Sequence, residues 1–251
     1  MPQRYFIQLS FKGTHFHGWQ KQENAISIQD VLEKSLSLLL HNQIELVGAG
    51  RTDTGVHALY YIAHFDSPHE IIDKKKIIYQ LNQILSFDIA VQQIIPVIAS
   101  AHARFDAVSR TYEYHIVHEK EPFEKETSLL LFSKPDLALI NEACKALFEY
   151  SDFTSFCKLH SDNKTNICNI REASWHYEEK KLIFTIKADR FLRNMVRAIT
   201  GTMLEIGFGK ISLDDFRKII ESKDRSKAGN SIPSHGLFLT GIEYPENLII
   251  N

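Results

Sequence analysis

The sequence contains few cysteines, and none of them form a metal-binding pair. Three occur in 251 residues, at Cys144, Cys157 and Cys168. An odd number without a C-x-x-C pair argues against a disulfide framework and against a cysteine-rich zinc site. We therefore interpret the three thiols as buried or unreactive side chains.

Long apolar runs are also missing near the N-terminus. Residues 1–11 mix apolar and polar side chains, with a polar residue at every second or third place. This pattern matches neither the apolar core of an export signal nor a membrane span. We expect a cytoplasmic protein with no membrane contact.

Neither sign of charge is in excess. The chain has 29 Lys and Arg against 31 Asp and Glu, a formal net charge of −2. It therefore has no overall attraction for a polyanion, and a nucleic-acid role would need a local basic patch. The hydrophobic fraction of 44% suits a globular chain with one large core or two small ones.

Periodicity predicts both strands and helices in the first half. Apolar residues alternate with others over 5–11, which predicts a strand with one buried face. Ser27 followed by Asp30 resembles a capping box, and the helical spacing of apolar residues predicts a helix to Leu40. The other elements expected here are strands over 44–47, 57–65 and 89–97 and a helix over 74–85.

The second half repeats this order of elements. Its expected strands are 112–116, a hairpin of 173–177 with 182–186, and 237–244, and its expected helices are 136–150, 191–206 and one after the capping box Ser212 and Asp215. We predict an α+β fold of two similar subdomains, 1–106 and 107–251, with a mostly antiparallel mixed sheet and helices packed on one face. A cleft between such subdomains is the expected place for an active site.

The segment from Gly48 to Ala58 has the densest chemical signal. It places three glycines, an arginine, an aspartate and two threonines within eleven residues, and it matches neither common phosphate-loop spacing. One interpretation is a glycine-rich turn in which Asp53 caps a helix or pairs with Arg51. The other is a reactive loop that exposes the Asp53 carboxylate.

This segment resembles the catalytic loop G-A-G-R-T-D-A-G-V-H-A of the tRNA pseudouridine synthase A family, with Thr54 as the one departure. Further segments resemble the family in the same order, namely Gly18-Trp19-Gln20, Ser27-Ile28-Gln29 and Asp152 to Phe156. The resemblance covers residues 5–245. It implies that Asp53 is the nucleophile that isomerises uridine to pseudouridine in the anticodon stem-loop of tRNA, at expected positions 38, 39 and 40.

The resemblance also implies four substrate-binding residues. Phe191 to Arg197 is similar to the family's F-L-x-x-M-V-R helix, which implies that Arg197 pairs with Asp53, and Arg51 is a second candidate for that pairing. Tyr112 matches the tyrosine that packs against the target base, although alternation with Tyr114 also fits a core aromatic. Leu237 matches the leucine of the uracil pocket, while residues 232–235 depart from the family's form.

The expected helix over 191–206 would place Arg190, Arg193 and Arg197 on one face, where a solvated basic face is the ordinary interpretation. Gly201 falls on that face at a cost of about 1 kcal/mol against alanine, so we expect something to approach closely there. Other candidates for phosphate contacts are Arg51, His102, Arg104, Arg110, Lys158, Lys164 and Arg171.

No cofactor and no metal are expected. The reaction is an isomerisation without redox change, and His15, His17, His57, His102 and His160 contain no helical zinc motif. The expected partners are tRNA and a second copy of the chain in a homodimer, as the resemblance implies. The alternative is a non-catalytic tRNA-binding or RNA-folding protein in which Asp53 has only a structural role.

Overall fold

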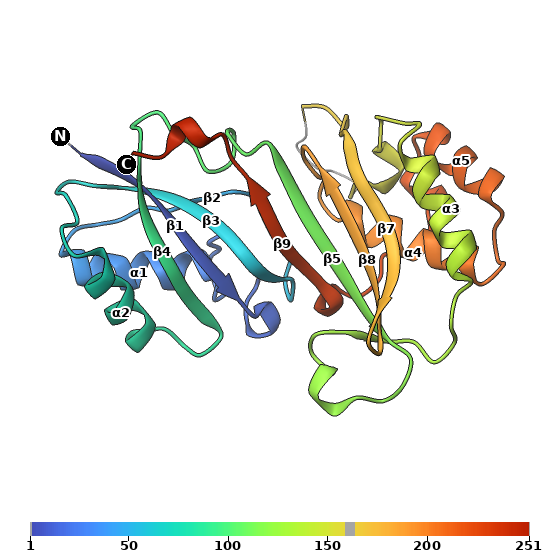
Figure 1. Ribbon diagram of the computed structural model, residues 1–251, viewed down its shortest axis with the longest axis horizontal. Coiled ribbons are helices and arrows are strands. Elements are labelled where there is room, and N and C mark those ends of the chain that lie inside the picture. The colour runs from blue at the N-terminus through green and yellow to red at the C-terminus, as the bar shows by residue number, and fades with distance from the viewer. Residues whose placement is uncertain (1, 159–163, 251) are drawn as a thin grey trace. The chain divides into compact units, whose positions relative to one another are not determined.

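The computed structural model describes residues 2–158 and 164–250, and the chain forms two compact units (Figure 1). Unit 1 consists of Met1–Val108 and Leu239–Asn251, and unit 2 consists of Ser109–Phe238. The C-terminal segment bonds within unit 1, where the Val108 N–H donates to the Glu243 carbonyl at 2.8 Å. Because Val108 and Glu243 are far apart in the sequence, only the tertiary structure brings them together.

Unit 1 is built on an antiparallel sheet. Its strands are β1 (Gln3–Phe11), β2 (Val47–Gly48), β3 (His57–Ser67) and β4 (Ile89–Val97). β1 lies between β3 and β4, so that Ile7 faces Ala63 on one side and Ile94 on the other, and β2 adds to β3. The predicted strands over 5–11, 57–65 and 89–97 are confirmed.

The strand expected over 44–47 is wrong except at its last residue. The backbone there bonds to side chains of helix α1 (Ile28–Leu40). The Leu46 N–H donates to Glu33 Oε1 at 3.0 Å, and the Ile44 N–H donates to Ser37 Oγ at 2.9 Å. Because a helix satisfies these backbone groups, the segment buries its apolar side chains without forming a ladder.

The helices of unit 1 begin at polar caps. Ser27 Oγ accepts from the Asp30 N–H before α1, which then buries Ile28, Leu32 and Leu36 completely. Helix α2 (Lys74–Ile84) begins after Asp73 in the same way and contacts both α1 and β4. These side chains satisfy backbone donors that a helix start leaves without a partner.

Unit 2 combines mostly antiparallel strands with helices. Its strands are β5 (Ser109–Val117), β6 (Leu129–Leu130), β7 (Ile170–Glu178) and β8 (Lys181–Ala188), and its helices are α3 (Leu137–Leu147), α4 (Met195–Gly207) and α5 (Leu213–Ser222). β8 pairs antiparallel with β5 and β7, and the short β6 is parallel to β5. The hairpin, the helix expected over 136–150 and the helix after the capping box of Ser212 with Asp215 are confirmed.

Helix α4 begins later than expected. Asn194 before it has φ +68° in the left-handed region, and the helix starts at Met195. Arg190 and Arg193 therefore precede the helix, and the prediction that they share a helical face with Arg197 is wrong. Apolar spacing continues through 191–194, but the left-handed residue interrupts the helical backbone.

The last strand, β9 (Leu237–Glu243), crosses the division between the two units. With mostly antiparallel strands and helices packed against β4 and β7, the α+β class is confirmed. Over the described ranges 2–158 and 164–250, no helix is long and apolar enough to cross a membrane.

Candidate functional site

The loop between β2 and β3 carries Asp53. Residues 49–56 form neither helix nor strand, and β3 follows directly at His57. A helix cap needs a helix after it, so the interpretation of Asp53 as a helix cap is wrong. Arg51 is exposed, Thr52 is buried and Asp53 is partly exposed, so the loop presents Asp53 to solvent.

The backbone of residues 13–18 packs directly on this loop. A Cβ placed on Gly18 would lie 2.2 Å from the Thr52 carbonyl oxygen, and one on Gly13 would lie 2.0 Å from that of Val56. Gly18 also has φ +78°, which side chains disfavour. Glycine at both positions lets two stretches of backbone touch, and this contact defines the path of the loop.

Hydrogen bonds join the same two segments. The Gly13 N–H donates to His57 Nδ1 at 3.0 Å, and the Gly55 N–H donates to the Phe16 carbonyl at 3.4 Å. A ring nitrogen that accepts carries no proton, so the buried His57 is neutral with its proton on Nε2. His57 is therefore a positioning side chain that ties the start of β3 to residue 13.

Aromatic side chains support the first residues of the loop. Trp19 stacks on Tyr61 with ring centroids 4.3 Å apart, and the Tyr61 hydroxyl donates to the Gly50 carbonyl at 2.5 Å. A Cβ on Gly48 would lie 2.1 Å from that hydroxyl oxygen and 2.5 Å from the Trp19 ring. A larger residue at position 48 would separate the loop from this support.

In unit 2, helix α4 positions Arg197, and a distant segment orients its side chain. Arg197 Nε donates to the Ile232 carbonyl at 2.8 Å, and the Ile232 N–H donates to the Arg197 carbonyl at 3.3 Å. A Cβ on Gly201 would lie 2.0 Å from the Asn230 carbonyl oxygen. The close approach expected at Gly201 is confirmed, and the approaching group is backbone of the same chain.

Strand β5 carries two tyrosines with different surroundings. Tyr112 is partly exposed and packs edge to face with Phe191, with centroids 5.1 Å apart at 88°. Tyr114 is fully buried, and its hydroxyl donates to the Pro233 carbonyl at 2.8 Å. Burial raises the pKa of Tyr114, and the nearby charge of Arg197 acts in the opposite direction. The core aromatic of this strand is Tyr114, and it remains a protonated donor at neutral pH.

Leu237 lies at the start of β9 and is buried at 6% exposure. Just before it, a Cβ on Gly236 would lie 2.8 Å from Cζ of Tyr114, and just after it Phe238 stacks on His115 at 4.5 Å. Residues 230–238 therefore run from α4 to β5. This segment contacts α4, which carries Arg197, and β5, which carries Tyr112.

Several predicted phosphate contacts gather at one end of the unit 2 sheet. Arg110 and Ile170 both face Ala188 in the sheet register, which brings the neighbourhoods of Arg110, Arg171 and Arg190 together. Arg110 Nη1 donates to the Asp189 carbonyl at 2.9 Å. Asp189 lies in the same neighbourhood, where its carboxylate accepts from the N–H groups of Asn169 and Arg190.

The remaining predicted contacts are dispersed. Arg193 is exposed, and its carbonyl accepts from the Lys158 N–H at 3.0 Å. Lys164 is exposed, and His160 lies outside the described residues. Within the part of the chain that the structure covers, no group of three His, Cys, Asp or Glu side chains could hold a metal ion.

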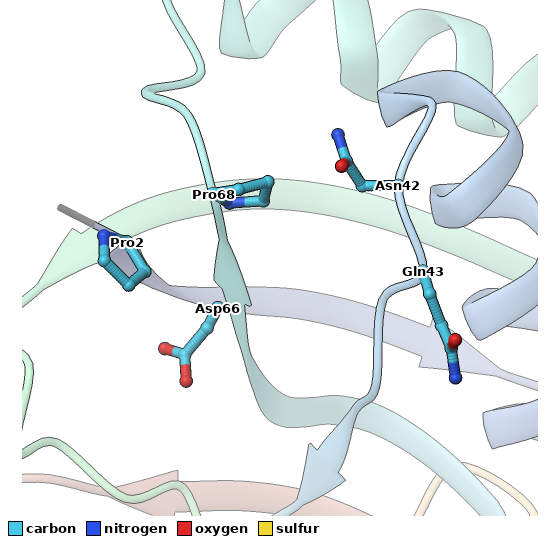
Figure 2. A pocket seen from close by; sticks show the side chains of 5 residues that line it. All are labelled: Pro2, Asn42, Gln43, Asp66 and Pro68. Carbon is cyan, nitrogen blue, oxygen red and sulfur yellow. The ribbon is translucent and has the colours of Figure 1, made fainter.

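Two open depressions occur elsewhere on unit 1. The larger, of about 620 Å³, is surrounded by side chains that are spread around it and do not converge (Figure 2). They are Pro2, Asn42, Gln43, Asp66 and Pro68. A second, of about 400 Å³, adjoins it at Asn42 and contains Lys76. Neither includes a predicted site residue, so neither is assigned to substrate.

Sequence reasoning missed the residues that position the site. Gly13, Gly18 and His57 hold the Asp53 loop, and Tyr114 with the Ile232 carbonyl holds the Arg197 region. Isolated glycines inside strand-like sequence are a signal of close backbone approach, which could have identified Gly13 and Gly18. A backbone carbonyl has no such signal.

Comparison with known proteins identifies the family. A family model described as tRNA pseudouridine synthase matches residues 8–106 and 143–245, which include the Asp53 loop and helix α4. The matched residues therefore include both parts of the candidate site, and the class of protein is the one that the family model describes. The chain belongs to the tRNA pseudouridine synthase family.

Bacterial relatives match over nearly the whole chain. The tRNA pseudouridine synthase A of Parabacteroides distasonis is 53% identical over 245 residues, covering 98% of this chain and 97% of the relative. That of Bacteroides fragilis is 53% identical over 247 residues, with 98% of each chain covered. That of Bacillus subtilis is 38% identical over 240 residues, covering 94% of this chain and 97% of the relative.

Proposed function

We propose that this protein converts uridine to pseudouridine in tRNA, with Asp53 as the nucleophile. The observation that carries the proposal is the partly exposed Asp53 on a loop held by backbone contacts at Gly13 and Gly18. This loop lies within the matched family segment 8–106, and relatives of 38% to 53% identity are tRNA pseudouridine synthases. A reactive group benefits from such rigid support because small displacements reduce rates strongly.

The chemistry needs a group that holds an intermediate. The bond from N1 of uracil to C1′ of ribose breaks, the base turns, and a new bond forms from C5 to C1′. The proton of C5 leaves and N1 gains one, so product and substrate have the same atoms and no redox partner takes part. A carboxylate can bind the intermediate covalently while the base turns.

We assign the substrate-binding roles by residue. Arg197 is the ionic partner of the Asp53 carboxylate, because a guanidinium favours the ionised form of a neighbouring acid. Arg51 is exposed and lies two residues before Asp53, and we assign it a contact with RNA phosphate. The partly exposed Tyr112 ring stacks on the target base, and Leu237 forms the apolar wall beside it.

The finer proposal concerns the RNA and the assembly. We infer that the substrate is the anticodon stem-loop, where unpaired bases are accessible to a protein. The strand register that brings the segments of Arg110, Arg171 and Arg190 together supports binding to phosphates along the RNA. We further propose that the protein acts in the cytoplasm as a homodimer.

The decisive experiment is Asp53→Asn, with release of tritium from C5-labelled uridine in tRNA as the readout. We expect no release while tRNA binding remains close to wild type, because the amide keeps the size of the side chain but is not a nucleophile. Asp214→Asn, an exposed change on α5, is the matched control and retains activity.

The same assay tests the alternative of a non-catalytic tRNA-binding protein. Wild-type protein that binds tRNA and releases no tritium would overturn the enzymatic proposal. An Asp53→Asn variant that releases tritium at the wild-type rate would refute the role of Asp53 and leave the activity itself in place.

A further inference from the structure

A tight turn at residues 102–106 displays an aromatic ring on the surface of unit 1. The His102 N–H donates to Asp106 Oδ2 at 2.7 Å, and the Asp106 N–H donates to the His102 carbonyl at 3.1 Å. His102 Nδ1 accepts from the N–H groups of Arg104 and Phe105 at 3.1 and 3.3 Å. The turn is therefore held by its own first and last residues.

Phe105 is 73% exposed although this turn restrains it. Its ring lies 4.3 Å from that of His102, and the Arg104 guanidinium carbon is 5.6 Å from its centroid. Phe87 and Phe123 are exposed even more, yet in the described part of the chain neither has a ring or cation contact. Phe105 thus differs from an incidental surface aromatic, which is common and needs no explanation.

Side chains of strands β1 and β3 form hydrogen bonds with the backbone at this turn. The buried His64 on β3 accepts from the Ala103 N–H at 3.1 Å, and its ring lies 4.6 Å from that of His102. Arg4 on β1 donates to the Ala101 carbonyl at 3.0 Å and forms a two-bond ion pair with Asp66. A restrained ring loses little conformational freedom on binding, which favours a ligand contact.

We propose that Phe105 and Arg104 form a stacking site for an unpaired base of the tRNA, distinct from the target uridine. This inference rests on the proposed function. Nucleic-acid bases stack on exposed aromatic rings and on guanidinium planes, and an adjacent arginine can bind the phosphate of the stacked nucleotide.

The target base already has a stacking partner in the proposed site, namely Tyr112. The Asp53 loop joins β3 at both of its ends, since His57 follows it directly and β2 before it pairs with His64 through Val47. The Phe105 turn is a separate segment, held by its own hydrogen bonds and by His64. Because Tyr112 is assigned to the target base, we assign a base on Phe105 to another nucleotide, so the site contributes to RNA binding and not to the chemical step.

The test is Phe105→Ala, with Phe105→Trp as the conservative variant and Phe87→Ala as the matched control. We expect Phe105→Ala to weaken tRNA binding by about 5- to 150-fold, which is the value of base stacking converted at tenfold per 1.4 kcal/mol. Phe105→Trp and Phe87→Ala should bind as wild type does, and fully double-stranded RNA should bind all four proteins equally.

Steady-state kinetics and the salt dependence of binding distinguish loss of the stacking site from loss of structure. Phe105→Ala should raise KM with an unchanged rate at saturating tRNA, and Arg104→Gln should reduce the slope of log affinity against log salt by about 0.7. Equal tRNA affinity of Phe105→Ala and Phe87→Ala would overturn the proposal, as would an equal loss on double-stranded RNA. Binding is measured without turnover, so this result is independent of whether wild-type protein releases tritium.

Discussion

Replacing Gly18 by alanine should displace the Asp53 loop. The alanine would occupy φ +78°, which costs a side chain about 1–2 kcal/mol. Its Cβ would lie 2.2 Å from the Thr52 oxygen, and contacts below 3.0 Å essentially never occur, so the loop must move by about 0.8 Å. Overpacking of this kind costs about 1–3 kcal/mol, which makes the expected loss of stability about 2–5 kcal/mol.

Gly209→Ala separates the two contributions. Gly209 has φ +67°, and a Cβ there would meet nothing within 4 Å. We expect it to lose only the backbone term of about 1–2 kcal/mol and to retain the wild-type rate. For Gly18→Ala, a displacement near 1 Å should lower the single-turnover rate on the order of 100-fold.

The measurements are urea unfolding and tritium release at saturating tRNA in a single turnover. Gly18→Ala should lose more stability than Gly209→Ala and should bind tRNA with nearly wild-type affinity. Equal stability of the two variants, or a wild-type rate for Gly18→Ala, would show that the backbone contact does not position the loop.

Two further changes test other parts of the structure. Burial, with a smaller contribution from Arg4, lowers the pKa of His64 from 6.5 to about 4. The stability that neutral His64 contributes is therefore fully present above pH 6.5 and is lost as pH falls toward 4. Urea unfolding should show about 1–2 kcal/mol less stability at pH 5 than at pH 7, and His64→Asn, which keeps an acceptor for the Ala103 N–H, should remove this part of the pH dependence. Gly201→Ala should push the Asn230 carbonyl off α4 and lower kcat through Arg197, and a wild-type kcat would refute that link.

Local chemistry accounts for the elements that the sequence predicts correctly. The strand over 5–11 and the helix from Ser27 follow from the spacing of apolar residues and from a cap three residues away. The capping box of Ser212 and Asp215 forms as expected because both partners lie in one turn. In each case the decisive neighbours are within a few residues along the chain.

The errors arise where distant groups compete for the backbone. Ile44 and Leu46 have strand-like composition, but their N–H groups bond to side chains of α1. Phe191 to Asn194 has helical spacing, but the left-handed conformation of Asn194 delays α4 to Met195. Periodicity reports which side chains are buried and does not report where the backbone hydrogen bonds go.

The site shows the same division. The family can be read from the order of side chains around Asp53, because a motif of neighbouring residues is contained in the sequence itself. Only the tertiary structure decided that Tyr114 is the buried tyrosine, that Asn230 lies against Gly201, and that the C-terminal segment joins unit 1. These contacts join residues far apart in sequence and often involve backbone atoms, which are the same in every amino acid and so leave no mark in the sequence.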